Sequence, residues 1–303
     1  MKVINFGSLN IDKVYGVHDF VRPGETVVAQ SLHLFAGGKG LNQSIAIARA
    51  GAECLHAGAI GCDGAFLEDL LRNAGVDVSH IMHTQSDTGH AIIQVTDKGE
   101  NGIIVYAGAN NLLDRNYVDS ILSLGSKGDI VLLQNETSMT DYIISKSRTM
   151  GYYIVFNPSP FPVSPENLPL TSVDLFMVNE IEAALLAGVD QGTDFDKILS
   201  ILVNRYQSRM IVMTVGAKGV LCAQGKKRWS EIAFPAEGVD TTAAGDTFCG
   251  YFLASLLKGF GMEKCLEYAS LASAIAISRP GAAPSIPMFA EVEASRMKNG
   301  RCG

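Results

Sequence analysis

Short apolar runs alternate with amphipathic segments over most of the chain. Runs rich in Val, Ile and Leu between turn residues are typical of strands, and longer segments with apolar positions three to four apart are typical of helices. The pattern predicts strands at residues 3–6, 54–60, 130–134, 153–157, 175–178, 210–215 and 219–223. It predicts helices at residues 41–50, 65–73, 115–124, 141–150, 194–207, 247–257 and 263–278, with another beginning near Asn179. This order indicates an α/β fold, a three-layer αβα sandwich around a mostly parallel sheet.

Two early segments depart from this alternation. Residues 26–35 have an extended pattern, and a turn-rich loop at residues 97–101 joins the strand patterns 88–96 and 102–106 into a hairpin. We expect these segments to form a small antiparallel sheet that stands off the main domain as a lid, within residues 12–36 and 88–108. No repeat or low-complexity linker divides the sequence, so residues 1–303 are interpreted as a single domain.

Composition and charge exclude several classes of protein. Hydrophobic residues make up 47% and charged residues 18% of the chain, as in a globular protein. The net charge of −7 argues against a nucleic-acid partner, and the basic run Lys226-Lys227-Arg228 fits an exposed hairpin tip. No segment has the roughly 18 apolar residues of a membrane span, and no apolar leader precedes the first strand. The six cysteines form no CxxC pair, so we expect a cytosolic protein without a membrane partner.

Polar residues gather where the predicted strands end. Ligands bind beyond the carboxyl ends of parallel strands, so these residues indicate one shared cleft. They are Asn10, Asp12, Glu136, Asn157, Asn179 and Thr214. Alternation places Asn10 and Asp12 on one face, a suitable pair for sugar hydroxyls, although an ordinary turn explains them equally well.

The segment Asp240-Thr241-Thr242-Ala243-Ala244-Gly245-Asp246-Thr247-Phe248 precedes an apolar helix. Its small residues allow a ligand to approach the backbone, and the unpaired N–H groups of a helix N-terminus favour an anion. Asp246 would place a base beside that anion, as activation of a hydroxyl next to a phosphate requires. The alternative is an aspartate that only caps the helix.

Phe35-Ala36-Gly37-Gly38-Lys39-Gly40-Leu41-Asn42-Gln43 is a second candidate site. Its glycines could wrap a small ligand, with Lys39 and Asn42 as polar contacts, or could form a tight connection from strand to helix. The spacing is not that of a Walker A loop. Asn179 and Glu182 could form a capping box, or lie near phosphates and a hydrated Mg²⁺, or do both.

These two segments resemble the two signatures of the ribokinase-like (PfkB) carbohydrate kinases in order and in separation. Further likenesses are Asn179-x-x-Glu182, Thr214-x-Gly216 and Gly281-Ala282-x-Pro284-Ser285. Within the family the likeness is greatest to the ribokinases, through Gly7-Ser8-Leu9-Asn10-Ile11-Asp12 and Ala107-Gly108-Ala109-Asn110.

The resemblance implies transfer of the ATP γ-phosphoryl group to a sugar hydroxymethyl, from D-ribose to D-ribose 5-phosphate, and a homodimer formed through the lid. It implies Asp246 as base and the backbone N–H groups of Ala243, Ala244, Gly245 and Asp246 as an anion hole. The implied sugar-binding residues are Asn10, Asp12, Gly38, Lys39, Asn42 and Glu136, with Asp246. The implied nucleotide contacts are Asn179, Thr214, Gly216 and Gly245, with Glu182 organising Mg²⁺ through water. The implied site for K⁺, a monovalent activator, comprises Asp240, Thr242, Ala276, Gly281 and Ser285.

Other functions stay open at this point. A kinase of the same family could act on fructose, deoxyribose or a nucleoside, although a nucleoside would need an aromatic platform, for which Phe35 and Tyr106 are the candidates. Leu41 and His90 depart from the ribokinase pattern and leave the sugar undecided. A catalytically silent sugar-binding regulator is a second alternative. A nicotinamide-dependent oxidoreductase is disfavoured because no G-x-G-x-x-G follows the first strand.

Overall fold

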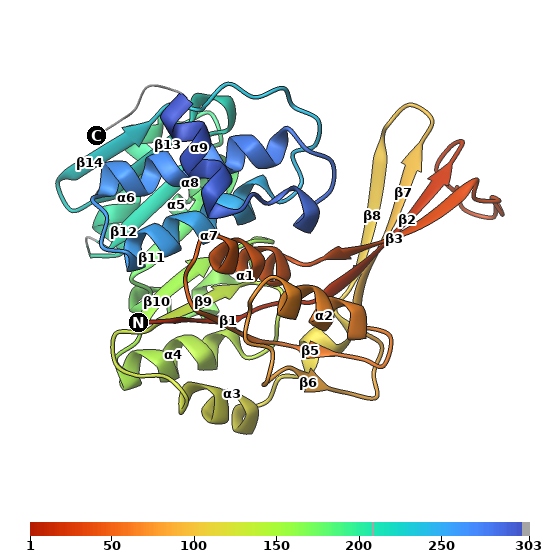
Figure 1. Cartoon of the computed structure of the whole chain (residues 1–303), viewed down its shortest axis with the longest axis horizontal. Helices are drawn as coiled ribbons and strands as arrows, with labels where there is room; N and C mark the ends of the chain where they lie inside the picture. Colours follow the sequence, from red (N-terminus) through yellow and green to blue (C-terminus); the bar gives the residue numbers. More distant parts are fainter. Residues whose placement is uncertain (208, 299–303) are drawn as a thin grey trace.

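The computed structural model describes residues 1–207 and 209–298 and contains an eight-stranded sheet (Figure 1). The strands, in spatial order, are β14 (Lys227–Glu231), β13 (Val220–Gln224), β12 (Met210–Thr214), β11 (Leu175–Asn179), β10 (Tyr153–Asn157), β9 (Ile130–Gln134), β1 (Val3–Phe6) and β4 (Cys54–Ala57). Pairing is parallel from β4 to β12, whereas β13 and β14 are antiparallel. The expected mostly parallel sheet is confirmed.

Helices cover both faces of this sheet. The helices are α1 (Lys39–Arg49), α2 (Ala65–Asn73), α3 (Arg115–Leu122), α4 (Thr140–Met150), α5 (Glu180–Ala187), α6 (Phe195–Arg205), α7 (Ala244–Leu257), α8 (Met262–Ile277) and α9 (Phe289–Lys298). Successive strand residues point to opposite faces, so Ile130 and Leu132 pack with α1, α2, α7 and α8, while Val131 and Leu133 pack with α3 to α6. Two cores on either side of one sheet make the three-layer arrangement.

The lid is a separate four-stranded sheet that projects from the main domain (Figure 1). Its strands, in spatial order, are β3 (Ser31–Gly37), β2 (Asn10–Val17), β7 (Gly89–Thr96) and β8 (Asn101–Tyr106). The expectation of an antiparallel sheet is wrong at its centre, because β2 pairs with β7 in parallel. Both strands leave the main domain in the same direction, with Asn10 opposite Gly89. The sequence analysis did not expect β2 to begin at residue 10, because an ordinary turn explains that part of the sequence equally well.

Other elements differ in extent from the sequence-based expectation. The expected strand 54–60 is divided into β4 and β5 (Ala59–Ile60), and β5 pairs with β6 (Met82–His83). Neither β14 nor α9 was expected, because both have weakly periodic, largely polar sequences. Within residues 1–207 and 209–298, none of the helices combines the length and apolar character that crossing a membrane requires.

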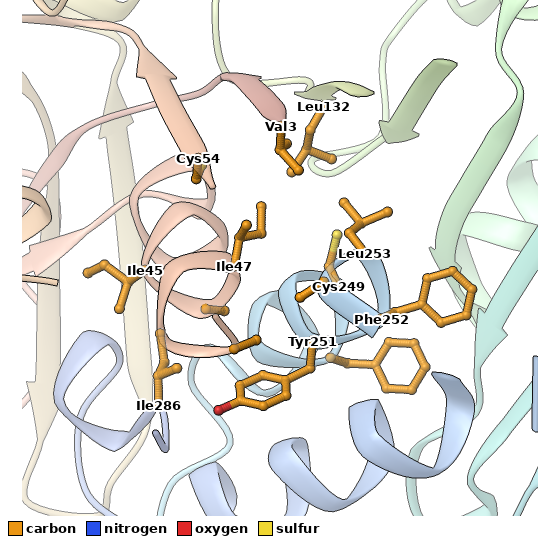
Figure 2. Close-up of a cluster of buried hydrophobic side chains, with 14 of the residues drawn as sticks. Val3, Ile45, Ile47, Cys54, Leu132, Cys249, Tyr251, Phe252, Leu253 and Ile286 are labelled. Atoms are coloured by element: carbon orange, nitrogen blue, oxygen red, sulfur yellow. The ribbon is translucent and has the colours of Figure 1, made fainter. Parts of the chain in front are cut away.

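Helices α1 and α7 pack closely against each other. Figure 2 shows Ile47 of α1 and Cys249 of α7 gathered beside Val3 and Leu132 of the sheet. Gly250 makes this approach possible, because a Cβ atom there would lie 2.4 Å from the Cβ of Ala46 and 2.8 Å from the nitrogen of Ile47. The close packing brings the first turn of α1 against the first turn of α7, where the predicted sugar site and the predicted base lie.

Candidate active site

Helix α7 begins at a strained turn that exposes backbone N–H groups. Ala243, the residue before the helix, has a left-handed backbone with φ of 60°, and no side chain caps the helix. The N–H groups of Ala243, Gly245 and Asp246 have no acceptor among the described residues. The N–H group of Ala244, however, donates to the carbonyl of Thr241 at 3.2 Å. Of the four amides expected in the anion hole, three are therefore without a protein acceptor in the described part of the chain.

The carboxylate of Asp246 is held by two side-chain amides from α1. Asn42 Nδ2 donates to Asp246 Oδ2 at 3.1 Å, and Gln43 Nε2 donates to Asp246 Oδ1 at 2.9 Å. Asp246 is buried against protein and also lines the cavity described below. Its position beside free amides provides a hydrogen-bond acceptor next to an anion site, the arrangement that general-base catalysis requires.

Charges of both signs meet at the first turn of α1. Glu136 Oε2 accepts the backbone N–H of Lys39 at 3.0 Å and also the hydroxyl of Ser8. Burial lowers the pKa of Lys39, but the carboxylates of Asp246, Glu136 and Glu182 outweigh it and raise that pKa above its ordinary value. Lys39 is therefore a partly buried ammonium group among carboxylates, suited to an anionic or polyhydroxylated ligand.

A cavity of about 450 Å³ joins these helix ends to the carboxyl edge of the sheet. The predicted residues on its wall are Lys39, Asn179, Glu182, Thr214, Gly216, Ala243, Ala244, Gly245 and Asp246. Phe234 and Ile277 add apolar surface to the wall. A wall that combines polar and apolar groups suits a molecule with phosphates and a ring.

Asn179 and Glu182 form the capping box of α5. Asn179 Oδ1 accepts the N–H of Glu182 at 2.8 Å, and Glu182 Oε2 accepts the N–H of Asn179 at 3.0 Å. Burial raises the pKa of Glu182. The capping role is confirmed, and the location of both residues on the cavity wall leaves the ligand role compatible with it.

Asn10 and Asp12 lie on the lid strand β2 and do not line this cavity. Asn10 Oδ1 accepts from Asn110 Nδ2 at 2.8 Å, which joins the lid to the main domain. Burial, together with the charge of Glu136, raises the pKa of Asp12 to about 6. Because Glu136 acts electrostatically on both Asp12 and Lys39, the lid carboxylate belongs to the charge cluster at the start of α1.

Of the residues expected around a monovalent cation, Asp240, Thr242 and Gly281 lie on two loops that a hydrogen bond joins. Asp240 Oδ1 accepts the N–H of Thr242 at 2.8 Å, and Asp240 Oδ2 accepts the N–H of Gly281 at 2.9 Å. Ser285 belongs to the short helix Ala283–Ser285 and Ala276 to the end of α8. These residues contain carboxylate, hydroxyl and main-chain carbonyl oxygens, the kind of ligand that an alkali-metal ion requires.

The sequence analysis missed several site residues. Gln43 contacts Asp246 directly, Ser8 contacts Glu136, and Asn110 holds Asn10. A signal was present, because Asn42 and Gln43 are consecutive amides at the start of a helix whose buried residues are otherwise mostly apolar or small.

A model of the pfkB family carbohydrate kinases matches residues 1–288. The ribokinase of Haemophilus influenzae is 33% identical over 287 residues, which cover 93% of this chain and 94% of that protein.

Solved ribokinase structures also resemble this chain. The Arabidopsis thaliana ribokinase complexed with ribose and ATP superposes with a TM-score of 0.86 at 28% identity and covers 97% of both chains. The ribokinase of Cryptococcus neoformans in complex with ADP superposes with a TM-score of 0.85 at 31% identity, covering 97% of this chain and 98% of the other.

Proposed function

Because the chain belongs to the pfkB family of carbohydrate kinases, we propose that it phosphorylates D-ribose with ATP to give D-ribose 5-phosphate and ADP. The single observation that carries the proposal is the position of Asp246, a carboxylate on a cavity wall beside the free amides of the α7 N-terminus. The similarity to ribokinases, one of which was solved with ribose and ATP, supports ribose as the sugar.

In the proposed reaction Asp246 accepts the proton of the sugar hydroxymethyl. The resulting oxygen forms a bond to the γ-phosphorus, the bond from that phosphorus to the β,γ-bridging oxygen breaks, and ADP leaves with the electron pair. The N–H groups of Ala243, Gly245 and Asp246 stabilise the charge on the phosphoryl oxygens. Lys39 adds a positive charge at the same end of the cavity.

The nucleotide would occupy the 450 Å³ cavity. We assign its phosphates to the end formed by Gly245 and Asn179, and its base to the apolar end near Phe234 and Ile277. The cavity wall fits a hydrated Mg²⁺, because Glu182 supplies a carboxylate there. The metal would supply charge neutralisation to the phosphates when bound.

The sugar would lie between the lid and the main domain, against Asp12, Asn10, Asn42, Glu136 and the Gly38-Lys39 turn. Asn42 Oδ1 is buried and has no hydrogen-bond partner within the described part of the chain. A sugar hydroxyl would supply the missing donor.

Two accessory features complete the proposal. A monovalent cation, K⁺, would bind at the Asp240 and Gly281 loops, whose main-chain oxygens, with the carboxylate of Asp240, supply suitable ligands.

Two copies of the chain would form a homodimer through their lids, because the lid exposes the apolar side chains of Phe35, Ile103 and Val105. The five cysteines that the structure describes are free, as in a cytosolic protein.

The test is a coupled ADP-release assay over a panel of sugars and nucleosides, in K⁺ and in a buffer free of K⁺ and Na⁺. Ribose should give the highest kcat/KM, and the rate should be faster in K⁺ than in the buffer free of K⁺ and Na⁺.

Asp246→Asn should fold normally and lose about 10²–10⁴-fold in kcat, since a positioned base contributes that much. Asp141→Asn, which changes an exposed carboxylate in the first turn of α4, is the matched control. Near-wild-type turnover by Asp246→Asn would refute the base assignment, and a preference for another substrate would refute ribose.

A further inference from the structure

A row of buried and partly buried side-chain amides lies behind the carboxylate of Asp246. Gln43 Nε2 donates to Asp246 Oδ1 at 2.9 Å and to Asn157 Oδ1 at 3.0 Å. Gln43 Oε1 accepts from Gln134 Nε2 at 2.6 Å, and Gln134 Nε2 also donates to Asn5 Oδ1 at 3.0 Å. The row therefore connects α7 and α1 to the neighbouring strands β10, β9 and β1.

Main-chain carbonyls fix the orientation of this row at both ends. Asn157 Nδ2 donates to the carbonyl of Met177 at 2.8 Å, and Asn5 Nδ2 donates to the carbonyl of Gly40 at 2.9 Å. A carbonyl oxygen can only accept, so neither terminal amide can be reversed without losing its hydrogen bond. Gln43 between them must direct its NH₂ group toward Asp246.

We propose that Gln43 is the positioning residue that presents Asp246 to the substrate as an ionised, correctly oriented base. This inference rests on the proposed kinase function and assigns that function a residue beyond those the family resemblance supplied. An unprotonated carboxylate oxygen accepts a hydrogen bond from the Gln43 N–H group, whereas a protonated oxygen would direct its own hydrogen against that donor. The contact also selects one rotation of the carboxylate, which leaves the remaining lone pairs for the sugar hydroxyl.

A purely structural role explains the row poorly. Gln134 Oε1 is buried without a partner among the described residues, which is a cost that an apolar side chain would avoid. Gln43 itself is fully buried and uses both N–H groups. Among the described residues, the ionisable groups that interact electrostatically with Asp246 are Lys39, Glu136, Glu182 and Cys249, and the hydrogen bond to Asp246 Oδ1 comes from Gln43.

Two substitutions at position 43 and one control test this role, with kcat and KM measured from pH 5 to pH 9. Gln43→Leu removes the hydrogen-bond donor and should lower kcat about 10–100-fold, the range found when a residue that orients a functional side chain is lost. The KM of ATP should change less. Gln43→Glu preserves size but sets a second carboxyl group against Asp246. The two acids would then share a proton, which should move the acid limb of the kcat/KM profile upward by about one pH unit or more.

Ser44→Ala is the matched control because Ser44 is the next residue of α1, is equally buried and binds Asn5 and His56 rather than Asp246. It should lower the melting temperature without moving the pH profile. The proposal is overturned if folded Gln43→Leu and Gln43→Glu both keep the wild-type profile and lose no more kcat than Ser44→Ala. If Gln43→Leu does not fold, the profile of Gln43→Glu decides alone. Failure of the kinase function has a different signature, because the wild-type protein would then release no ADP with any substrate of the panel.

Discussion

At the scale of single residues, burial at the proposed sugar site disfavours the charge that binding requires. Burial and the nearby charge of Glu136 raise the pKa of Asp12 to about 6, from 3.8 in an exposed side chain. An ionised Asp12 can accept hydrogen bonds from sugar hydroxyls, but keeping that charge in the folded protein lowers the free energy of unfolding. The affinity of the site and the stability of the fold thus respond to pH in opposite ways.

We expect Asp12→Asn to be more stable than the wild type at pH 8 and to have a higher KM for the sugar. Because the folded-state pKa is raised, the cost of the ionised form is fully present above about pH 6 and disappears as the pH falls to 3.8. The gain in melting temperature, about 2–4 °C for each kcal/mol in a large domain, should therefore shrink between pH 6 and pH 4. Differential scanning fluorimetry across this range measures the gain in melting temperature, and a gain that grows at low pH would contradict the raised pKa of Asp12.

The wild-type KM for the sugar should rise below about pH 6.

Single residues also set the limit of what the sequence could predict. Asp246, Lys39 and Asn179 stand in motifs whose local geometry the chain dictates, and the structure places all three on one cavity wall. The hydrogen bond from the Ala244 N–H group to the carbonyl of Thr241 could not be foreseen, because it depends on the path of the turn. Gln43 was missed because its partners Gln134 and Asn157 lie about 90 and 114 residues away.

At the scale of elements, the packing of α1 against α7 aligns the site. Helix α1 carries Asn42 and Gln43, α7 carries Asp246, and Gly250 allows the two backbones to approach. Helices with strong apolar patterns were predicted to within a few residues, whereas α9, whose polar residues surround the single buried side chain Val292, was not. The parallel pairing of β2 with β7 was also missed, because strand pairing over 80 residues leaves no local signal.

Gly250→Ala should therefore reduce both stability and turnover. The added methyl group would lie 2.4 Å from Ala46, so α1 and α7 must separate, at a cost of about 1–3 kcal/mol for overpacking. Separation would lengthen the Asn42 and Gln43 contacts to Asp246, and we expect kcat to fall about tenfold, since misplaced catalytic groups lose rate steeply.

Gly192→Ala is the control, because a methyl group at residue 192 meets no atom within 4 Å. Chemical denaturation and steady-state kinetics compare the two variants. Wild-type kcat in Gly250→Ala would show that this helix contact does not align the base.

At the scale of the whole molecule, the lid exposes apolar surface that a single chain leaves uncovered. Residues paired across the lid strands share a face, so Ile103, Phe35 and Val105 lie on the face of Asp12, and Ile104 lies on the opposite face. The opposite face is partly occupied by the chain itself, because Val21 and Val27 line a 280 Å³ groove with Tyr15. A second subunit would therefore cover the Asp12 face.

Ile103→Glu should convert the proposed dimer into a monomer, because a charge would be buried in the interface. Ile104→Glu changes a neighbouring, similarly exposed isoleucine on the other face and should remain dimeric. Sedimentation velocity of the wild type and both variants tests this. A monomeric wild type, or loss of the dimer in Ile104→Glu alone, would contradict the assigned face.

The division of the proposed sugar contacts between two bodies has a consequence for selectivity. Asn10 and Asp12 belong to a lid strand, whereas Asn42 and Asp246 belong to helices of the main domain. A sugar that engages both sets would bridge the lid and the main domain. An analogue missing one hydroxyl would lose contacts on one side of that bridge. Discrimination between sugars would then depend on how many contacts each sugar makes with the lid and the main domain at once.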